Sequence, residues 1–348
     1  MPDRSDRRRG RLNRAAWGVV AAVAALALAG CPDDDCTDWA ALAELDRAAL
    51  AVQGVAVDDV WVVGGGLGLG GPLAAHWDGE RWTRHDPAGP AGDDTLWWVW
   101  TASDGTTWMV GEHGLVVRRR GADVSIERIA TDATLYGVWG SAPDDVWIVG
   151  GVAGGGGDAE DDFVRRWDGA RFTTPPGVPV RGATLFKVWG AAAGDVWIAG
   201  EGGTMLHATA TAVVDHSAEL ATPAPALTVH GCSASEVYAV AGQRLYAWDG
   251  VRWSWRDEPA LGSVANGVAC GAAGVLVVGN AGMKLRWDRE SGRWADERAG
   301  APNGVDLHGA WIDELGRAWA VGGNFNTPMA ASRRGVVGER GCPRVAQM

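Results

Sequence analysis

The chain has 348 residues, with 52 Gly, 21 Trp and a formal net charge of -12. Its length allows a large buried core, and glycine at this level without a Gly-X-Y period indicates many turns and excludes collagen. Residues 1–30 carry six Arg against two Asp, so the remainder carries -16, and such an acidic body disfavours nucleic acid, whose binding needs neutralising Lys and Arg contacts.

The first thirty residues have the layout of an export signal. An Arg-rich stretch at 4–14 precedes an apolar run that ends at Leu28 and is too short to span a bilayer comfortably. The sequence Leu28-Ala29-Gly30-Cys31 resembles the bacterial lipobox. That resemblance implies a lipoprotein signal peptide over 1–30, lipidation of Cys31, and a short polar spacer that completes the segment 31–36. The alternative is ordinary signal cleavage, which leaves Cys31 free or disulfide-bonded.

One sequence unit recurs seven times in the rest of the chain. Its clearest copy joins Leu135-Tyr136-Gly137-Val138-Trp139-Gly140 to Asp145-Val146-Trp147-Ile148-Val149-Gly150. The eight-residue spacing of Trp139 and Trp147 recurs in three further pairs: Trp100 and Trp108, Trp189 and Trp197, Trp311 and Trp319. The units start near residues 49, 96, 135, 185, 226, 264 and 306. This period of about 40–50 residues is typical of propeller blades.

Each unit is predicted to form four short strands. The first two pieces are almost wholly apolar and are bounded by Gly, Pro and Asp, as inner strands buried on both faces should be. The third ends in Trp-Asp-Gly, and Asp168-Gly169 is a hairpin signal, because both residues tolerate the positive φ of such turns. No segment of the repeats has a convincing 3.6-residue apolar period, so we expect an all-β fold.

The units resemble those of bacterial β-propellers related to the WD-repeat, Kelch and bacterial-neuraminidase-repeat groups. The matching motif is Val-Trp-Gly, Asp-Val-Trp-x-Val-Gly and Trp-Asp-Gly in order, over residues 49–340. The resemblance implies a tryptophan-rich, seven-bladed β-propeller of four-stranded blades. It says little about function, because propellers host many unrelated activities.

The ring is predicted to close with an N-terminal strand. The seventh unit contains Trp311 and Trp319 but is not followed by a Trp-bearing fourth strand. Residues 37–45 include Trp39, which stands before the first unit as Trp294 stands before the last. We therefore expect 37–45 to be the outer strand of the seventh blade and the propeller to span 37–348. The competing interpretation of residues 39–50 is a short Ala/Leu helix.

The cysteines fit this closure. An exported chain lies where disulfides persist, and with Cys31 lipidated four cysteines remain. Cys36 precedes the borrowed strand and Cys342 follows the third strand of the same blade, which predicts a bond between them. Cys232 and Cys270 stand within one residue of each other in repeat register on adjacent blades, which predicts the second bond. Two buried free thiols at 232 and 270 are the alternative.

The face that carries the loops between second and third strands is the predicted binding surface, because three of these loops, at 64–73, 151–162 and 323–332, are long. The candidate binding residues in the last two loops are Asp158, Glu160, Asp161, Asp162, Asn324 and Asn326. The acidic group could offer oxygen ligands to calcium. It lacks the alternating spacing of a calcium loop, so we expect a solvated loop and predict no metal and no cofactor.

No catalytic signature is present in the sequence. His76 and His230 occupy repeat positions and are predicted to be structural. Several aspartates recur at the turn before Val-Trp, and we interpret them as turn hydrogen-bonding residues instead of acid/base pairs. These are Asp58, Asp59, Asp144, Asp145 and Asp195.

We therefore expect a non-enzymatic binding or scaffold propeller. It would be exported, lipid-anchored in the bacterial cell envelope and monomeric, with a protein, peptide or glycan as ligand and no nucleic acid. An assembly factor for an envelope complex cannot be separated from this function by sequence. The alternative is a glycan-directed hydrolase or lyase, which needs carboxylates or an Arg cluster converging at the channel mouth.

Overall fold

The computed structural model describes residues 38–67, 70–87, 89–152, 162–257, 259–325 and 334–341. All of them belong to the second of two compact units into which the chain divides, residues 1–34 and 35–348. The predicted lipidation site Cys31 and the predicted pair Cys36 and Cys342 lie outside the described residues.

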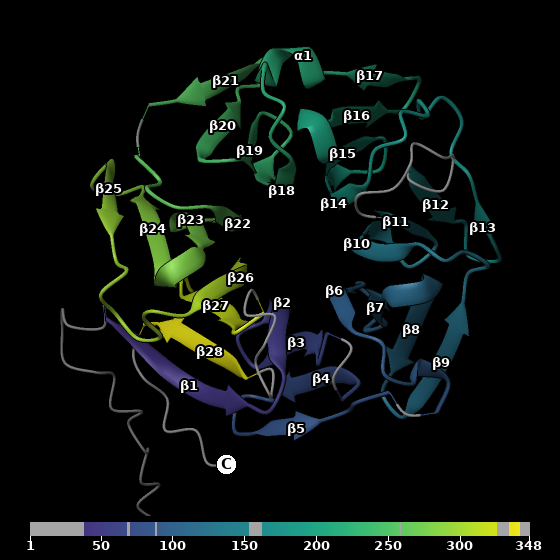
Figure 1. Ribbon diagram of the computed structural model, residues 1–348, viewed down its shortest axis with the longest axis horizontal. Coiled ribbons are helices and arrows are strands. Elements are labelled where there is room, and N and C mark those ends of the chain that lie inside the picture. Colours follow the sequence, from purple (N-terminus) through teal and green to yellow (C-terminus); the bar gives the residue numbers. More distant parts are fainter. Residues whose placement is uncertain are drawn as a thin grey trace, which may run out of the picture. The chain divides into compact units, whose positions relative to one another are not determined.

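The described residues form seven four-stranded antiparallel sheets arranged around a common centre (Figure 1). The innermost strands are β2 (Ala48–Ala56), β6 (Leu96–Thr101), β10 (Thr134–Ala142), β14 (Leu185–Ala192), β18 (Ala226–Ser233), β22 (Ala265–Gly271) and β26 (Asp306–Ile312). The second strands are β3 (Asp59–Gly65), β7 (Thr107–Gly111), β11 (Asp145–Gly151), β15 (Asp195–Gly200), β19 (Glu236–Ala241), β23 (Gly274–Gly279) and β27 (Ala318–Gly323). The predicted starts of the seven units all fall within one residue of an innermost strand's first residue.

The outer half of each sheet completes the blade. The third strands are β4 (Pro72–Trp77), β8 (Leu115–Arg120), β12 (Phe163–Trp167), β16 (Met205–Thr209), β20 (Arg244–Trp248), β24 (Met283–Asp288) and β28 (Gly335–Arg340). The outermost strands are β5 (Trp82–Arg84), β9 (Asp123–Arg128), β13 (Phe172–Thr173), β17 (Val213–Asp215), β21 (Trp253–Arg256), β25 (Arg293–Asp296) and β1 (Trp39–Leu45). The predicted seven-bladed β-propeller of four-stranded blades is confirmed.

Helical structure in the described ranges is limited to single turns. These are α1 (Ser217–Leu220) and the 3-10 turns η1 (Gly89–Ala91), η2 (Glu112–Gly114), η3 (Glu201–Gly203) and η4 (Asn280–Gly282). No helix within these ranges is long and apolar enough to cross a membrane.

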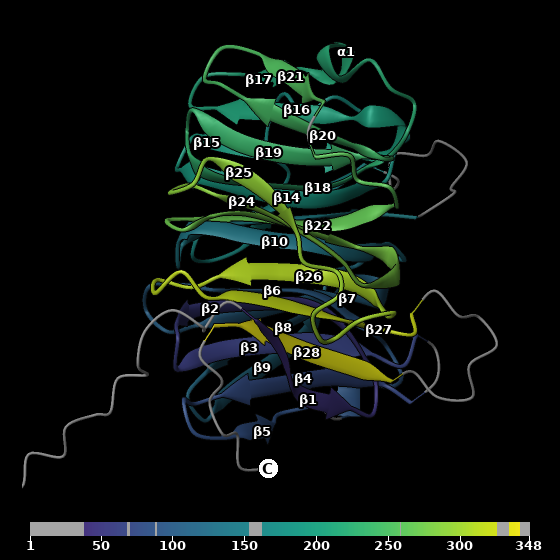
Figure 2. The same ribbon diagram turned by 90° about the vertical axis from the view of Figure 1, so that its left-hand side faces the viewer.

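An N-terminal strand closes the ring, as predicted. Strand β1 pairs antiparallel with β28, from Trp39 opposite Arg340 to Leu45 opposite Gly335. The two strands lie side by side in both views (Figures 1 and 2). The alternative of a short helix over 39–50 is wrong, because this segment forms β1 and the start of β2.

The Val-Trp-Gly motif joins neighbouring blades. Trp139 and Trp147 are directly opposite each other on β10 and β11, so the eight-residue spacing is a cross-strand pair. The glycine after the first tryptophan receives the ring of the preceding blade: a Cβ at Gly140 would lie 2.6 Å from Cη2 of Trp100. A Cβ at Gly190 would lie 2.5 Å from Cη2 of Trp139 in the same way. Glycine is therefore needed for close contact between blades.

The aspartates before Val-Trp have a role that differs from the predicted one. Asp59 Oδ1 pairs with His76 Nε2 at 2.8 Å, and Asp195 Oδ1 pairs with His207 Nε2 at 2.6 Å. Asp145 Oδ1 accepts a hydrogen bond from Arg166 Nε at 2.6 Å. These three carboxylates thus bond side chains on the third strand, because each opens the second strand and faces its neighbour. Asp145 also accepts a hydrogen bond within its own turn, from Ser141 Oγ at 2.6 Å. His76 is structural, as predicted, and also stacks on Trp61 with ring centroids 4.5 Å apart.

Candidate functional site at the channel mouth

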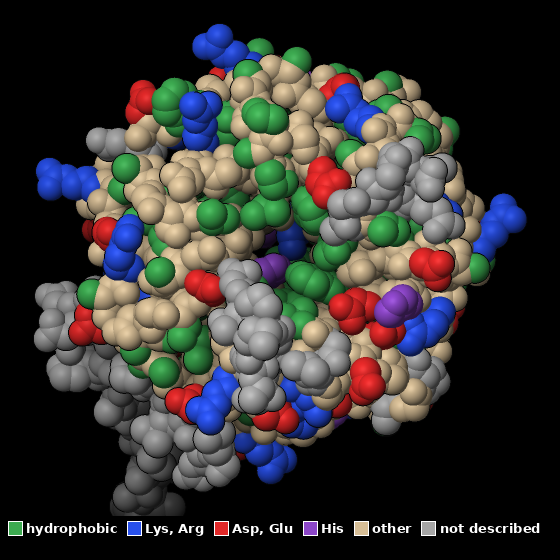
Figure 3. Space-filling model, in the orientation of Figure 1, with side chains coloured by type: hydrophobic (Ala, Val, Ile, Leu, Met, Phe, Trp, Pro, Cys, Tyr) green, Lys and Arg blue, Asp and Glu red, His purple; other side chains and the backbone are tan. Residues whose placement is uncertain are grey.

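The innermost strands surround a channel whose mouth holds a cavity of about 190 Å³. The side chains that line it come from six of the seven blades: Trp97, Tyr136, Phe186, Lys187, Leu227, Asn266 and His308. In the space-filling view, hydrophobic side chains surround a hollow at the centre of the ring, with histidine and basic side chains inside it (Figure 3).

The mouth opens on the face that the sequence predicts for binding. Each innermost strand begins opposite the end of the second strand of its blade, where the long loops start: Thr134 is opposite Gly151, and Asp306 is opposite Gly323. Phe325, from the loop of the seventh blade, lies against His308 with ring centroids 5.2 Å apart. The loop face and the channel mouth are therefore one surface.

A belt of aromatic rings lines the mouth. Trp97 and Tyr136 meet edge to face with centroids 5.0 Å apart, and Tyr136 and Phe186 do so at 5.4 Å. Trp97 meets His308 at 5.9 Å. Edge-to-face contacts fix ring positions while leaving apolar surface toward the cavity. Burial raises the pKa of Tyr136, so its hydroxyl is neutral at physiological pH.

Two polar side chains at the mouth are held by the fold. His308 Nδ1 lies 2.5 Å from the carbonyl oxygen of Leu50, so this nitrogen carries the proton. Burial, with a smaller effect of Lys187, lowers the pKa of His308 to about 4. The amide nitrogen of Asn266 donates to Asn280 Oδ1 at 2.8 Å and to the carbonyl of Leu307 at 2.9 Å.

Lys187 extends below the belt and lies between the mouth and a second cavity of about 90 Å³ further down the channel. Its side chain is 4 % exposed, and Nζ lies 2.9 Å from the centroid of the Trp98 ring. Burial lowers the pKa of Lys187 well below its ordinary value. None of the described residues that line the two cavities is Asp or Glu.

The predicted loop residues are placed only in part. Asp162 accepts hydrogen bonds from the backbone amides of Arg181, Gly182 and Ala183, so it orders the following loop. Asn324 donates its backbone N–H to the carbonyl of Arg334 at 3.1 Å, at the base of the last loop. The remaining four candidates, Asp158, Glu160, Asp161 and Asn326, lie outside the described residues.

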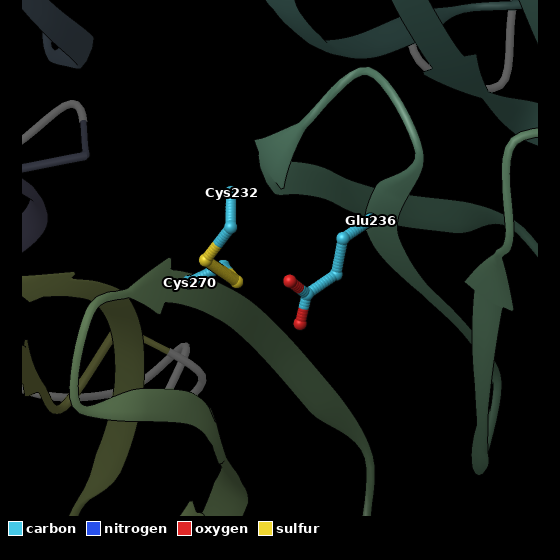
Figure 4. Close-up of side chains that lie close together, drawn as sticks. All are labelled: Cys232, Glu236 and Cys270. Atoms are coloured by element: carbon cyan, nitrogen blue, oxygen red, sulfur yellow. A yellow bond between two sulfur atoms is a disulfide. The ribbon is translucent and has the colours of Figure 1, made fainter. Parts of the chain in front are cut away.

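The second candidate cluster is the predicted disulfide. Cys232 and Cys270 are bonded, with Cα atoms 5.2 Å apart, and Glu236 lies beside them (Figure 4). Arg289 Nη2 lies 3.2 Å from Cys232 Sγ and 2.7 Å from Glu236 Oε1. Because both sulfurs are in the bond, the cluster offers no thiolate to a metal. The alternative of two free thiols is wrong.

A larger cavity, of about 440 Å³, lies between the fifth and sixth blades. It is lined by Tyr238, Leu245, Arg256, Asp257, Trp287 and Trp294. Its charged side chains, Arg256 and Asp257, are exposed to solvent. The mouth is the stronger candidate because residues of six blades converge on it and one of them is a buried lysine.

The sequence located this face but not these residues. Trp97 belongs neither to a tryptophan pair spaced by eight residues nor to a Trp-Asp-Gly turn, and Lys187 is one of only two lysines in the chain. Both features are visible in the sequence. Neither indicates a site by itself, because only the ring geometry shows that the beginnings of the innermost strands lie close together.

Known proteins are similar to this chain in fold. No protein-family model matches the sequence, and no curated protein matches it. Virginiamycin B lyase from Staphylococcus aureus, solved with quinupristin, is similar with a TM-score of 0.60 and 12% identity over 87% of this chain and 99% of that one. YCF48 bound to D1 peptide has a TM-score of 0.65 and 12% identity over 90% and 99%. The WD40 propeller domain of Doa1 has a TM-score of 0.58 and 10% identity over 86% and 96%.

Proposed function

We propose that this chain is a non-enzymatic binding module of the bacterial cell envelope, lipid-anchored through Cys31, and that its ligand enters the aromatic mouth of the channel. The observation that carries the proposal is the convergence of Trp97, Tyr136, Phe186 and His308 from four blades around one cavity. Aromatic rings supply large contact areas that are already ordered before binding, which lowers the entropic cost of association.

The size of the cavity indicates what part of a ligand it takes. Pockets for whole small molecules occupy roughly 300–1,000 Å³, whereas this mouth holds about 190 Å³. It therefore suits one end group or side chain of a larger ligand whose remainder lies on the loop face. A peptide is the ligand class we favour, and YCF48, which shares the fold, was solved with a peptide bound.

The enzymatic alternative has less support. Glycoside hydrolysis ordinarily uses two carboxylates across the scissile bond, and no Asp or Glu is present among the described residues that line the channel cavities. The site offers aromatic surface and one buried amine. These groups serve recognition better than hydrolysis.

Retention of an envelope component by variants of the intact lipoprotein tests the proposal. The double variant Trp97→Ala/Phe186→Ala removes half of the belt. Trp255→Ala is the matched control, because Trp255 is 52% exposed on β21, away from the channel. We expect a component of envelope extracts that wild type and control retain and the double variant loses. Equal retention by all three proteins would show that the mouth is not the binding site, and release of a chemically altered ligand would favour the enzyme.

The anchor has its own test. The lipobox-like sequence ending at Cys31 predicts cleavage before Cys31 and acylation of that residue. Mass spectrometry of the mature N-terminus decides this, and the variant Cys31→Ser should release the protein from the membrane fraction. An unmodified Cys31, or cleavage elsewhere, would contradict the proposed anchor.

A further inference from the structure

The two lysines of the chain are both buried, but they differ in their partners. Lys284 is 0% exposed, and its ammonium donates to the carbonyl oxygens of Gly282, Gly300 and Pro302 at 3.2, 3.0 and 2.7 Å. Lys187 has no oxygen partner among the described residues and lies only over the Trp98 ring. A buried amine without an acceptor is energetically unfavourable when it is charged, so the channel contains a lysine that lacks an anionic partner among the described residues.

Resting on the function proposed above, we infer that the mouth binds an apolar group that ends in a carboxylate. The carboxylate accepts a hydrogen bond from Lys187 Nζ, and the apolar part lies among Trp97, Tyr136 and Phe186. The C-terminal residue of a peptide has this chemistry when its side chain is apolar.

The donors at the mouth match a carboxylate better than other anions. Lys187 is the only ammonium group among the described residues that line the cavity, and none of those residues is Arg. Phosphate groups are recognised by several donors, commonly including Arg or a row of backbone amides. A single ammonium group suits a carboxylate better than a phosphate. Among the described residues, the other polar side chains that line the cavity, apart from the Tyr136 hydroxyl, are Asn266 and His308.

An acidic sugar fits this cavity less well. Its ring brings several hydroxyl groups, and each one buried without a partner is energetically unfavourable. Asn266 and His308 already donate to the protein, so few groups remain for sugar hydroxyls. The aromatic belt instead favours an apolar side chain beside the carboxylate.

Binding should be linked to uptake of a proton. Burial lowers the pKa of Lys187, and the titratable side chains that face it are His230 on β18 and His308 on β26, both uncharged at neutral pH. The nearby carboxylates Glu112 and Glu201 affect the pKa of Tyr136 and not that of Lys187. A carboxylate beside Nζ favours its charged form, so part of the protein population takes up a proton on binding.

Calorimetry with two matched probes tests the inference. N-acetyl-L-phenylalanine carries the carboxylate, and N-acetyl-L-phenylalaninamide differs only in lacking it. We expect wild type to bind the acid at least tenfold more tightly than the amide, with a binding enthalpy that depends on the ionisation enthalpy of the buffer. Lys187→Met should lose that preference while remaining folded. Arg244→Met is the matched control, because Arg244 also lies over a tryptophan ring, 4.5 Å from that of Trp255, but on the outer part of the fifth blade.

The calorimetric results distinguish failure of the carboxylate inference from failure of the proposed binding function. Equal affinity for acid and amide, retention of the preference by Lys187→Met, or tighter binding of glucuronic acid than of N-acetyl-L-phenylalanine would each overturn it. If neither probe binds while an envelope component still depends on Trp97 and Phe186, this inference fails and the binding function stands. A short peptide ending in the same residue should bind more tightly than the free acid if the ligand is a chain terminus, and no more tightly if it is a small molecule.

Discussion

The ring nitrogen Nδ1 of His230 accepts a hydrogen bond from the backbone N–H of Cys270 at 3.1 Å, across the junction of the fifth and sixth blades. At the junction of the first and second blades, Gln53 Oε1 accepts from the N–H of Thr101 at 3.0 Å. Both acceptors stand at the repeat position that is tryptophan in four other blades, and both donors stand where those junctions have glycine. Six of the seven junctions therefore use two alternatives: a tryptophan ring packed on glycine, or a polar acceptor bonded to a backbone amide. The junction of the sixth and seventh blades has Ala269 and Ile312 at these positions instead.

This alternation predicts that the two positions change together. Gln53→Trp should lower the free energy of unfolding by about 1–3 kcal/mol, because the ring would meet the Thr101 side chain. Adding Thr101→Gly should recover much of that loss, as it recreates the tryptophan–glycine contact. Denaturant unfolding of both single variants and the double variant gives the coupling free energy, and Thr101→Gly alone controls for its lost contact with Thr107. Simple additivity of the two changes would contradict the two-alternative description.

Acid should destabilise the ring through its buried histidines. The pKa values of His230 and His308 are lowered to about 4 by burial, against about 6.5 in the unfolded chain. A base with a lowered folded-state pKa contributes stability above the unfolded pKa and loses it as pH falls, here between pH 6.5 and 4. We expect a loss of about 1–3 kcal/mol per histidine over this window.

The Gln53 junction supplies the control for this pH effect. His230→Gln keeps an acceptor for the Cys270 amide but does not titrate. Unfolding free energies measured from pH 7 to 4.5 should show a shallower slope in this variant than in wild type. An unchanged slope would mean that His230 is not a source of the acid sensitivity.

The two lysines should respond in opposite directions to the same substitution. Lys187→Met removes a buried amine without an oxygen partner, so it should raise the free energy of unfolding at pH 7 by about 1–2 kcal/mol. Lys284→Met leaves three carbonyl oxygens without their donor and should lower it by about 2–4 kcal/mol. Thermal and denaturant unfolding measure both effects. A destabilised Lys187→Met variant would indicate a structural role for this lysine and weaken its assignment as a ligand group.

The disulfide should stabilise the junction of the fifth and sixth blades, which lacks the tryptophan–glycine contact. The bonded cysteines are 38 residues apart, and the loop-entropy model assigns such a bond about 3–4 kcal/mol. The variant Cys232→Ser/Cys270→Ser should lose that amount in denaturant unfolding. Treatment of wild type with a reductant that leaves the fold intact should reproduce the loss. A loss below about 1 kcal/mol would mean that the His230–Cys270 hydrogen bond and blade packing suffice.

The sequence repeats predicted the fold, because every blade shares them. The residues of the candidate site could not be predicted in this way, because they differ from one repeat to the next. Strand positions, the closing strand and the 232–270 bond all follow from register, since residues at equal repeat positions occupy equal places in successive blades. Trp97, Tyr136, Phe186 and His308 share one repeat position but differ in type, so comparing units hides them. The third-strand partners of Asp59, Asp145 and Asp195 were missed for a related reason: partners such as His207 and Arg166 lie on the next strand and differ from blade to blade.

The closing strand is held by one carboxylate that joins three strands. Trp39 Nε1 donates to Glu297 Oε2 at 2.8 Å, while Arg286 Nε and Arg340 Nε both donate to Glu297 Oε1 at 2.9 Å. Trp39 is 6% exposed and packs against Gly300, where a Cβ would lie 2.8 Å from that of Trp39.

Truncation of a buried tryptophan costs about 3–5 kcal/mol, so Trp39→Ala should destabilise the ring, and the effect should be local. Hydrogen exchange should show amides of β1 and β28 losing protection well before those of β10 and β11, with Trp255→Ala as a control that leaves the pattern unchanged. Uniform loss of protection in all blades would mean that the ring unfolds as a whole and that β1 is not a separable closure.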